Sequence, residues 1–117
     1  MRAAIARAGG IVVDELPEPE PAIGQVLVKS LACGICGSDL HALRHGEALV
    51  ALSRRAGAGF DYDPTSDVVF GHEFCAEVLD YGPRTDGSFP VGTRVVSIPR
   101  VPTESGAHIV GYSNRYH

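Results

Sequence analysis

The 117-residue sequence has no tryptophan, one methionine, three cysteines and no long apolar run. An odd number of cysteines without the spacing of a disulfide framework favours a reducing compartment, so we expect a cytoplasmic protein. The longest apolar run, residues 48–52, is far too short to cross a bilayer, so no membrane is expected as a partner. Basic residues are also scarce, with ten Lys and Arg against fourteen Asp and Glu. The resulting net charge of −4 argues against a nucleic acid partner.

What the chain does contain is ordinary for a globular protein. Hydrophobic residues make up 44% and charged residues 21% of the sequence, which is neither disordered nor fibrous in composition. The length fits one domain that buries its own core, and it leaves no room for a second domain. An activity that needs a separate cofactor-binding domain therefore cannot be complete within these residues.

Short apolar segments separated by glycine, proline and acidic residues predict a mainly β fold with short helices. Three prolines keep residues 16–24 extended. We expect two short helices, over residues 38–45 with Ser38 or Asp39 as the N-cap and over residues 47–56. Strands are expected over residues 2–13 with a turn at Gly9 and Gly10, and over residues 25–32, 68–70, 74–81, 91–98 and 107–112. Many short strands favour a small barrel over a doubly wound parallel sheet.

Two short motifs carry side chains with reactive chemistry. Residues 33–41 read Cys-Gly-Ile-Cys-Gly-Ser-Asp-Leu-His, and residues 71–73 read Gly-His-Glu. Cys36 precedes a predicted helix, whose free N–H groups and dipole favour a thiolate. Cys36, His72 and Glu73 offer the ligand types of a catalytic zinc site. Ser38 and His41 are three residues apart on one helix face, where they could pass a proton between an alcohol and solvent.

Each motif also fits a plainer interpretation when taken alone. Cys33 and Cys36 could be structural thiols or a thiol-disulfide redox pair, although the βαβ setting of such a pair is missing. The Gly-His-Glu sequence could be an ordinary strand connection, and the Ser38 helix a capped surface helix. Only the combination of the two motifs points to one kind of site.

That combination closely resembles the catalytic-zinc half of the medium-chain, zinc-dependent alcohol and polyol dehydrogenases. Flanking segments extend the resemblance: the proline stretch and strand of residues 16–29, Glu77-Val78, and the Val-Gly-Thr-Arg-Val of residues 91–95. It covers roughly residues 2–98. The resemblance implies a GroES-like, partly open β-barrel and a reaction that transfers hydride between an alcohol carbon and NAD(P). The implied substrate is a small alcohol, polyol or carbonyl compound.

The resemblance also implies roles for individual residues. Cys36 and His72 match zinc ligands, and Glu73 matches a neighbouring carboxylate that can approach the metal. Ser38 and His41 match the hydroxyl and imidazole of a proton relay, which removes the alcohol proton while zinc polarises the oxygen. The expected cofactors are therefore a catalytic Zn²⁺ and NAD(P).

The sequence departs from the family pattern in several places. The third zinc ligand of the family lies well downstream of His-Glu, beyond this chain, and no cysteine follows Cys75, so we expect weak zinc binding and no structural zinc. Cys33 matches a structural position and is expected to be buried. Residues 57–62 begin like a dinucleotide-binding loop, but Tyr62 replaces its last glycine, so no Rossmann domain is expected and the cofactor-binding residues stay unknown.

We therefore expect residues 1–117 to form a GroES-like zinc-site domain that is incomplete at its C-terminal end. The chain alone is expected to be inactive in hydride transfer and monomeric or weakly associating. The alternative is a non-enzymatic GroES-like module that binds a partner or sequesters metal, with Cys33 and Cys36 as its metal or redox clip. The substrate and the choice between NAD and NADP are left open.

Overall fold

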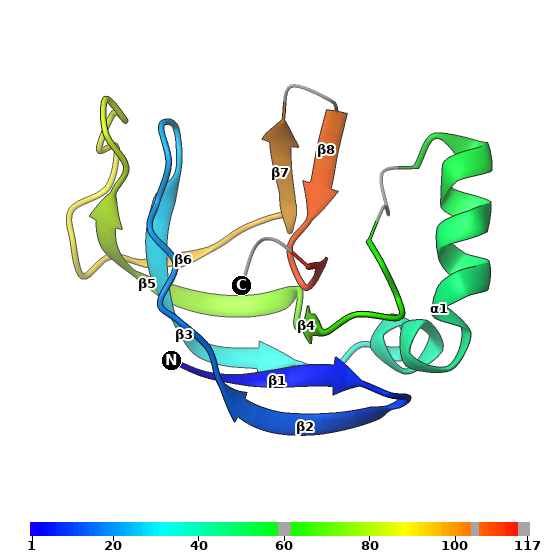
Figure 1. The fold of residues 1–117 in the computed structure, drawn as a ribbon. Helices are drawn as coiled ribbons and strands as arrows, with labels where there is room; N and C mark the ends of the chain where they lie inside the picture. The colour runs from blue at the N-terminus through cyan, green and yellow to red at the C-terminus, as the bar shows by residue number, and fades with distance from the viewer. Residues whose placement is uncertain (59–61, 104–105, 115–117) are drawn as a thin grey trace.

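The computed structural model describes residues 1–58, 62–103 and 106–114. The strands are β1 (Arg2–Arg7), β2 (Gly10–Glu15), β3 (Val26–Gly34), β4 (Val68–Phe70), β5 (Glu73–Tyr81), β6 (Arg94–Val96), β7 (Arg100–Thr103), β8 (Gly106–Ile109) and β9 (Tyr112–Ser113), and the helix is α1 (Gly37–Ala56). They form a four-stranded sheet in the order β2-β1-β4-β9, a three-stranded sheet β3-β5-β6, and the two-stranded pair β7-β8. This open arrangement of short strands confirms the expected mainly β fold (Figure 1).

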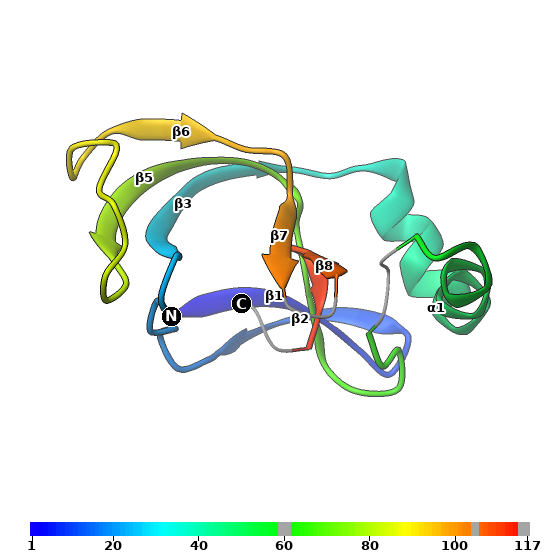
Figure 2. The same ribbon diagram turned by 90° about the horizontal axis from the view of Figure 1, so that it is seen from above.

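Antiparallel pairing between distant segments places the ends of β3 and β5 side by side. Cys33 pairs with Phe74 and Gly34 with Glu73, so the residues that follow β3 meet the residues that precede β5. The register shifts twice along this pair, and such irregularities bend a strand and increase its twist. The resulting curvature carries β3, β5 and β6 in an arch over β1 and β2 (Figure 2).

The two predicted short helices are one helical element with a kink. His45 has non-helical backbone angles, φ −134° and ψ 30°, at the boundary where the sequence predicted the first helix to end. The element ends at Gly57, whose left-handed φ of 64° lets its N–H turn back toward the last carbonyls. The predicted N-cap was wrong, because the helix is capped by Cys36 and not by Ser38 or Asp39.

The C-terminal part of the described chain also differs from the prediction. Residues 107–112 were expected to form one strand, but Gly111, at φ 83°, lies in a turn that separates β8 from β9. The β7-β8 pair was not predicted, since two prolines interrupt the apolar alternation there. The strand expected over 91–98 is limited to the three residues of β6.

The core lies between α1 and the four-stranded sheet. Its buried cluster consists of Ala6, Ala42, Val50, Tyr62, Val68 and Tyr112. Several large apolar side chains instead face outward, among them Val96 and Ile98, which are 77% and 80% exposed. In the part of the chain that the structure describes, no helix is both long and apolar enough to cross a membrane.

Candidate metal centre

Cys36 is held at the start of α1 by Asp39, one helical turn along the chain. The Cys36 backbone N–H donates to Asp39 Oδ2 over 3.0 Å, as the third helical residue does in a capping box. This bond satisfies one of the free N–H groups at the helix N-terminus. It also fixes the half-buried Cys36 in the short connection between the end of β3 and the start of α1.

Glycines on either side of the site give the side chains room. A Cβ on Gly34 would lie 2.7 Å from Glu73 Oε2, and a Cβ on Gly71 would lie 2.8 Å from Cys33 Sγ. Gly71 also has a φ of 128°, which L side chains rarely adopt. These two glycines let the β3 and β5 ends approach closely enough to face one another.

The structure brings the three predicted metal ligands together. One ligand atom each from Cys36, His72 and Glu73 lies within 4.8 Å of the others. Zinc bonds of about 2.0–2.3 Å place two ligands of a tetrahedral ion roughly 3.3–3.8 Å apart, so a small contraction would close the site around an ion. Thiolate, imidazole and carboxylate are also a donor set that zinc accepts.

The surroundings of His72 fit a metal ligand. Its Nδ1 is buried, lies 3.1 Å from Asp39 Oδ1, and has no hydrogen bond assigned to it among the described residues. A carboxylate beside Nδ1 favours the imidazole tautomer that is protonated on Nδ1. In that tautomer the lone pair of Nε2 is available to bind a metal. The Nε2 atom lies 3.5 Å from Ser38 Oγ, a long contact that leaves its lone pair available to a metal. The donor set and the available Nε2 lone pair, with Nδ1 buried beside Asp39, both fit a zinc ion.

The two predicted relay residues have different surroundings. Ser38 lies at the site, with its hydroxyl 3.5 Å from His72 Nε2. His41 lies one turn further along α1, is exposed, and has its ring 5.0 Å from that of His45. Cys33, expected to be buried, is exposed, because it lies at the open end of the β3-β5 pair.

Two residues of this site were not predicted for it. Asp39 is 7% exposed and Tyr112 only 3% exposed. The Tyr112 hydroxyl lies 2.7 Å from Asp39 Oδ1 and 2.9 Å from Ser38 Oγ. Asp39 was visible in the Cys-Gly-Ser-Asp sequence, where its position one turn into a helix could have suggested a link to Cys36. No sequence signal pointed to Tyr112, because it lies in a segment without clear periodicity.

The charge at the site and the burial of Tyr112 act together. Burial raises the pKa of the Tyr112 phenol well above its usual range, and the hydrogen bond to Asp39 adds to that rise. The hydroxyl therefore keeps its proton at neutral pH. It remains a hydrogen-bond donor beside the Asp39 carboxylate.

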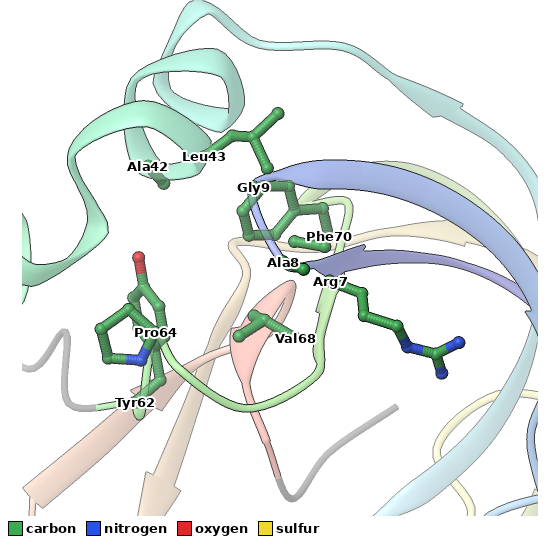
Figure 3. A pocket seen from close by; sticks show the side chains of 10 residues that line it. Arg7, Ala8, Gly9, Ala42, Leu43, Tyr62, Pro64, Val68 and Phe70 are labelled. Carbon is green, nitrogen blue, oxygen red and sulfur yellow. The ribbon is translucent and has the colours of Figure 1, made fainter.

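A separate small cavity of about 30 Å³ lies away from this site. Its lining includes Arg7, Ala42, Tyr62 and Pro64, and it lies between α1 and the turn that joins β1 to β2 (Figure 3). The volume suits about one water molecule and not a substrate. None of the three predicted metal ligands lines this cavity.

Comparison with known proteins identifies the family. The sequence profile of the Alcohol dehydrogenase GroES-like domain matches residues 22–113. The (R,R)-butanediol dehydrogenase of Bacillus subtilis is 35% identical over 89 residues, which are 76% of this chain and 25% of that protein. The sorbitol dehydrogenase of Gallus gallus is 36% identical over 99 residues, or 85% of this chain and 24% of that protein.

Solved structures agree with this family. The 2R,3R-butanediol dehydrogenase from Bacillus subtilis superposes with a TM-score of 0.70 at 28% identity, over 95% of this chain and 34% of that one. The Haloferax mediterranei glucose dehydrogenase, in complex with NADP, Zn and gluconolactone, has a TM-score of 0.68 at 25% identity, over 99% of this chain and 34% of that one.

These matches confirm the expected family and its GroES-like fold, and the relatives are dehydrogenases. The chain spans about a quarter of the length of these two dehydrogenases and about a third of the two solved structures. With the profile matched over residues 22–113, the chain belongs to the family of alcohol dehydrogenase GroES-like domains.

Proposed function

We propose that this chain is the zinc-site domain of an NAD(P)-dependent alcohol or polyol dehydrogenase. The observation that carries the proposal is the approach of Cys36, His72 and Glu73 to within 4.8 Å of one another. These residues come from the start of α1 and the start of β5, two elements that are distant in the sequence. Similarity to butanediol, sorbitol and glucose dehydrogenases supports a small alcohol, polyol or carbonyl compound as the substrate.

In this proposal Cys36, His72 and Glu73 hold the metal. The chemistry that zinc supplies when bound is Lewis-acid polarisation of an alcohol or carbonyl oxygen. The Asp39 carboxylate beside His72 Nδ1 keeps the ring in the orientation that presents Nε2. Cys36 keeps its place through its backbone bond to the same carboxylate.

Ser38 and His41 would handle the substrate proton. The Ser38 hydroxyl lies beside His72 Nε2, so it could accept the proton of an alcohol placed at the metal site while its own hydrogen passes on to His41. His41 lies on the same face of α1 and is exposed, so it can exchange that proton with solvent. The hydride would pass to the nicotinamide of NAD(P), a cofactor of this family whose binding residues in this protein are unknown.

Metal titration tests the proposal directly. Zn²⁺ and Co²⁺ are titrated into the wild-type chain, Cys36→Ser and Cys33→Ser, with affinity measured by competition against a chelator. Cys33 is a matched control because it is the same residue type three positions earlier and its thiol is exposed. We expect Cys36→Ser to weaken zinc binding more than about 100-fold and to remove the thiolate-to-Co²⁺ absorption, since losing a ligand costs more than losing a residue behind it.

The control decides between the two interpretations of the cysteine pair. Cys33→Ser is expected to keep the wild-type affinity and spectrum. Equal losses in both variants would favour a metal or redox clip made by the pair. Unchanged binding in Cys36→Ser would overturn the site assignment.

A further inference from the structure

Tyr112 reaches the metal centre from the opposite end of the described chain. It lies in β9, where its backbone pairs with Phe70 of β4, two residues before His72. Its side chain is 3% exposed, and its hydroxyl approaches two residues of α1 that lie more than 70 positions earlier in the sequence. Tyr112 is therefore part of the metal centre, although it lies outside the two sequence motifs at residues 33–41 and 71–73.

The hydrogen bonds of Tyr112 converge on atoms that already serve the site. Its hydroxyl lies 2.7 Å from Asp39 Oδ1, the same oxygen that lies 3.1 Å from His72 Nδ1. The hydroxyl also lies 2.9 Å from Ser38 Oγ. The Tyr112 hydroxyl has a single hydrogen to donate, and a carboxylate is a stronger acceptor than a hydroxyl. Tyr112 therefore donates mainly to Asp39. The Tyr112 oxygen is then left to accept the hydrogen of Ser38.

The ring of Tyr112 packs beside the imidazole. The ring centroids of Tyr112 and His72 are 5.1 Å apart with the planes 35° from parallel, and Phe70 lies 5.6 Å away on the same sheet. Aromatic pairs at such distances attract one another beyond the area they bury. Packing thus limits rotation of the His72 ring, while the hydroxyl acts on the groups around it.

Two glycines bring Tyr112 into this position. Gly111 has a φ of 83°, and a Cβ on it would lie 2.5 Å from the carbonyl oxygen of Gly71. The backbone of residue 111 therefore lies directly against the residue before His72. No other amino acid fits without movement, because the obstructing atoms belong to the main chain.

We propose that Tyr112 is a positioning residue of the metal centre, whose hydroxyl fixes the Asp39 carboxylate and the Ser38 hydroxyl and so orients the His72 ring. The inference rests on the proposed zinc function and deepens it. When the Ser38 hydroxyl donates its hydrogen to Tyr112, its lone pairs point away from that bond and can accept a hydrogen bond from an alcohol at the metal. Tyr112 itself need not touch the substrate.

The variant Tyr112→Phe removes the hydroxyl and keeps the ring against His72. Tyr81→Phe is the matched control, because the Tyr81 hydroxyl is also hydrogen-bonded, to the carbonyl of Phe89 over 2.7 Å, but lies outside the metal centre. Zinc affinity, the Co²⁺ d–d spectrum and the His72 ring ¹⁵N shifts are measured for each. Circular dichroism verifies that both variants are folded.

We expect Tyr112→Phe to weaken zinc binding by about 10- to 100-fold, as loss of an outer-shell partner does, and to change the Co²⁺ spectrum. In the metal-free chain, the ¹⁵N shifts recorded at one fixed pH should show a changed balance of the two His72 tautomers relative to the wild type. Tyr81→Phe should behave as the wild type in all three measurements. Unchanged ¹⁵N shifts in Tyr112→Phe, or an unchanged zinc affinity, would overturn the proposal.

A double-mutant cycle with Asp39→Asn tests whether Tyr112 acts on zinc affinity through Asp39. If Tyr112 acts through Asp39, the loss in zinc affinity on Tyr112→Phe is smaller in the Asn background. Equal losses in both backgrounds would contradict action through Asp39. Failure of the proposed zinc function can be told apart from failure of the Tyr112 proposal. If the chain has no zinc function, Cys36→Ser binds zinc no more weakly than the wild type. The ¹⁵N shifts of the metal-free chain still test Tyr112 in that case.

Discussion

Replacing Gly111 with alanine puts a methyl group against the backbone of Gly71. The added Cβ would lie 2.5, 2.6 and 2.8 Å from the Gly71 carbonyl oxygen, carbonyl carbon and nitrogen. Main-chain atoms cannot rotate away as the end of a flexible side chain can. The β8-β9 turn, the Gly71 loop or both must therefore shift, and Tyr112 and His72 are the residues that follow these two glycines.

The expected cost has two parts. An L residue held at the positive φ of 83° loses about 1–2 kcal/mol relative to glycine. Forcing an extra carbon into packed structure adds about 1–3 kcal/mol. The free energy of unfolding should therefore fall by about 2–5 kcal/mol, a large share of the total stability of a domain this size.

Gly92→Ala separates the two parts. Gly92 has a similar φ of 88°, but a Cβ at this position would meet nothing within 4 Å, so only the backbone strain applies. Equilibrium urea unfolding of both variants should place Gly111→Ala below Gly92→Ala by about 1–3 kcal/mol. Two variants within about 0.5 kcal/mol of each other would refute the close backbone contact. Weaker zinc binding is expected only in Gly111→Ala.

Three further outcomes follow from other parts of the molecule. The buried Tyr62 hydroxyl has no hydrogen-bond partner among the described residues, so Tyr62→Phe should be neutral or stabilising by up to about 1 kcal/mol in urea unfolding, and a clear loss would reveal a missed partner. Bonds from Ser66 and Thr65 lower the pKa of Asp63 to about 2. The pKa of Asp63 in the folded chain therefore lies below its ordinary value. The ionised Asp63 stabilises the folded chain fully above about pH 4, and this stabilisation is lost as the pH falls toward 2. Asp63→Asn should therefore lose less stability on acidification, and identical pH profiles would contradict this. His41→Ala should leave the zinc affinity unchanged, because His41 is exposed and proposed only as a proton carrier; a large loss on metal titration would make it a ligand.

The sequence predicted the parts of the fold that rest on local patterns. The alternating residues of β3 and β5 form strands as we expected, and the turn between β1 and β2 falls at Ala8 and Gly9, one residue before the predicted Gly9 and Gly10. Chemistry and family resemblance together named Cys36, His72 and Glu73, which the fold brings together. These residues stand at strand and helix ends, which short-range patterns can locate.

Other features depend on contacts that no local pattern encodes. Cys36 caps α1 because Asp39 bonds back to it, and the sequence alone favoured the ordinary capping residues. Tyr112 joins the site through a two-residue strand and a glycine turn, too short for any periodicity to appear. Cys33 was expected to be buried, but exposure depends on which elements cover the end of β3.

The order in which the site residues occur along the chain gives zinc a second role. In the sequence, all of α1 and β4 lies between Cys36 and His72, so an ion held by both residues would cross-link the chain in the manner of a removable disulfide. An ion that binds only the folded chain adds about 2.7 kcal/mol at a free concentration 100 times its dissociation constant. Metal supply would then shift the folding equilibrium of the whole domain, including strands that touch no ligand.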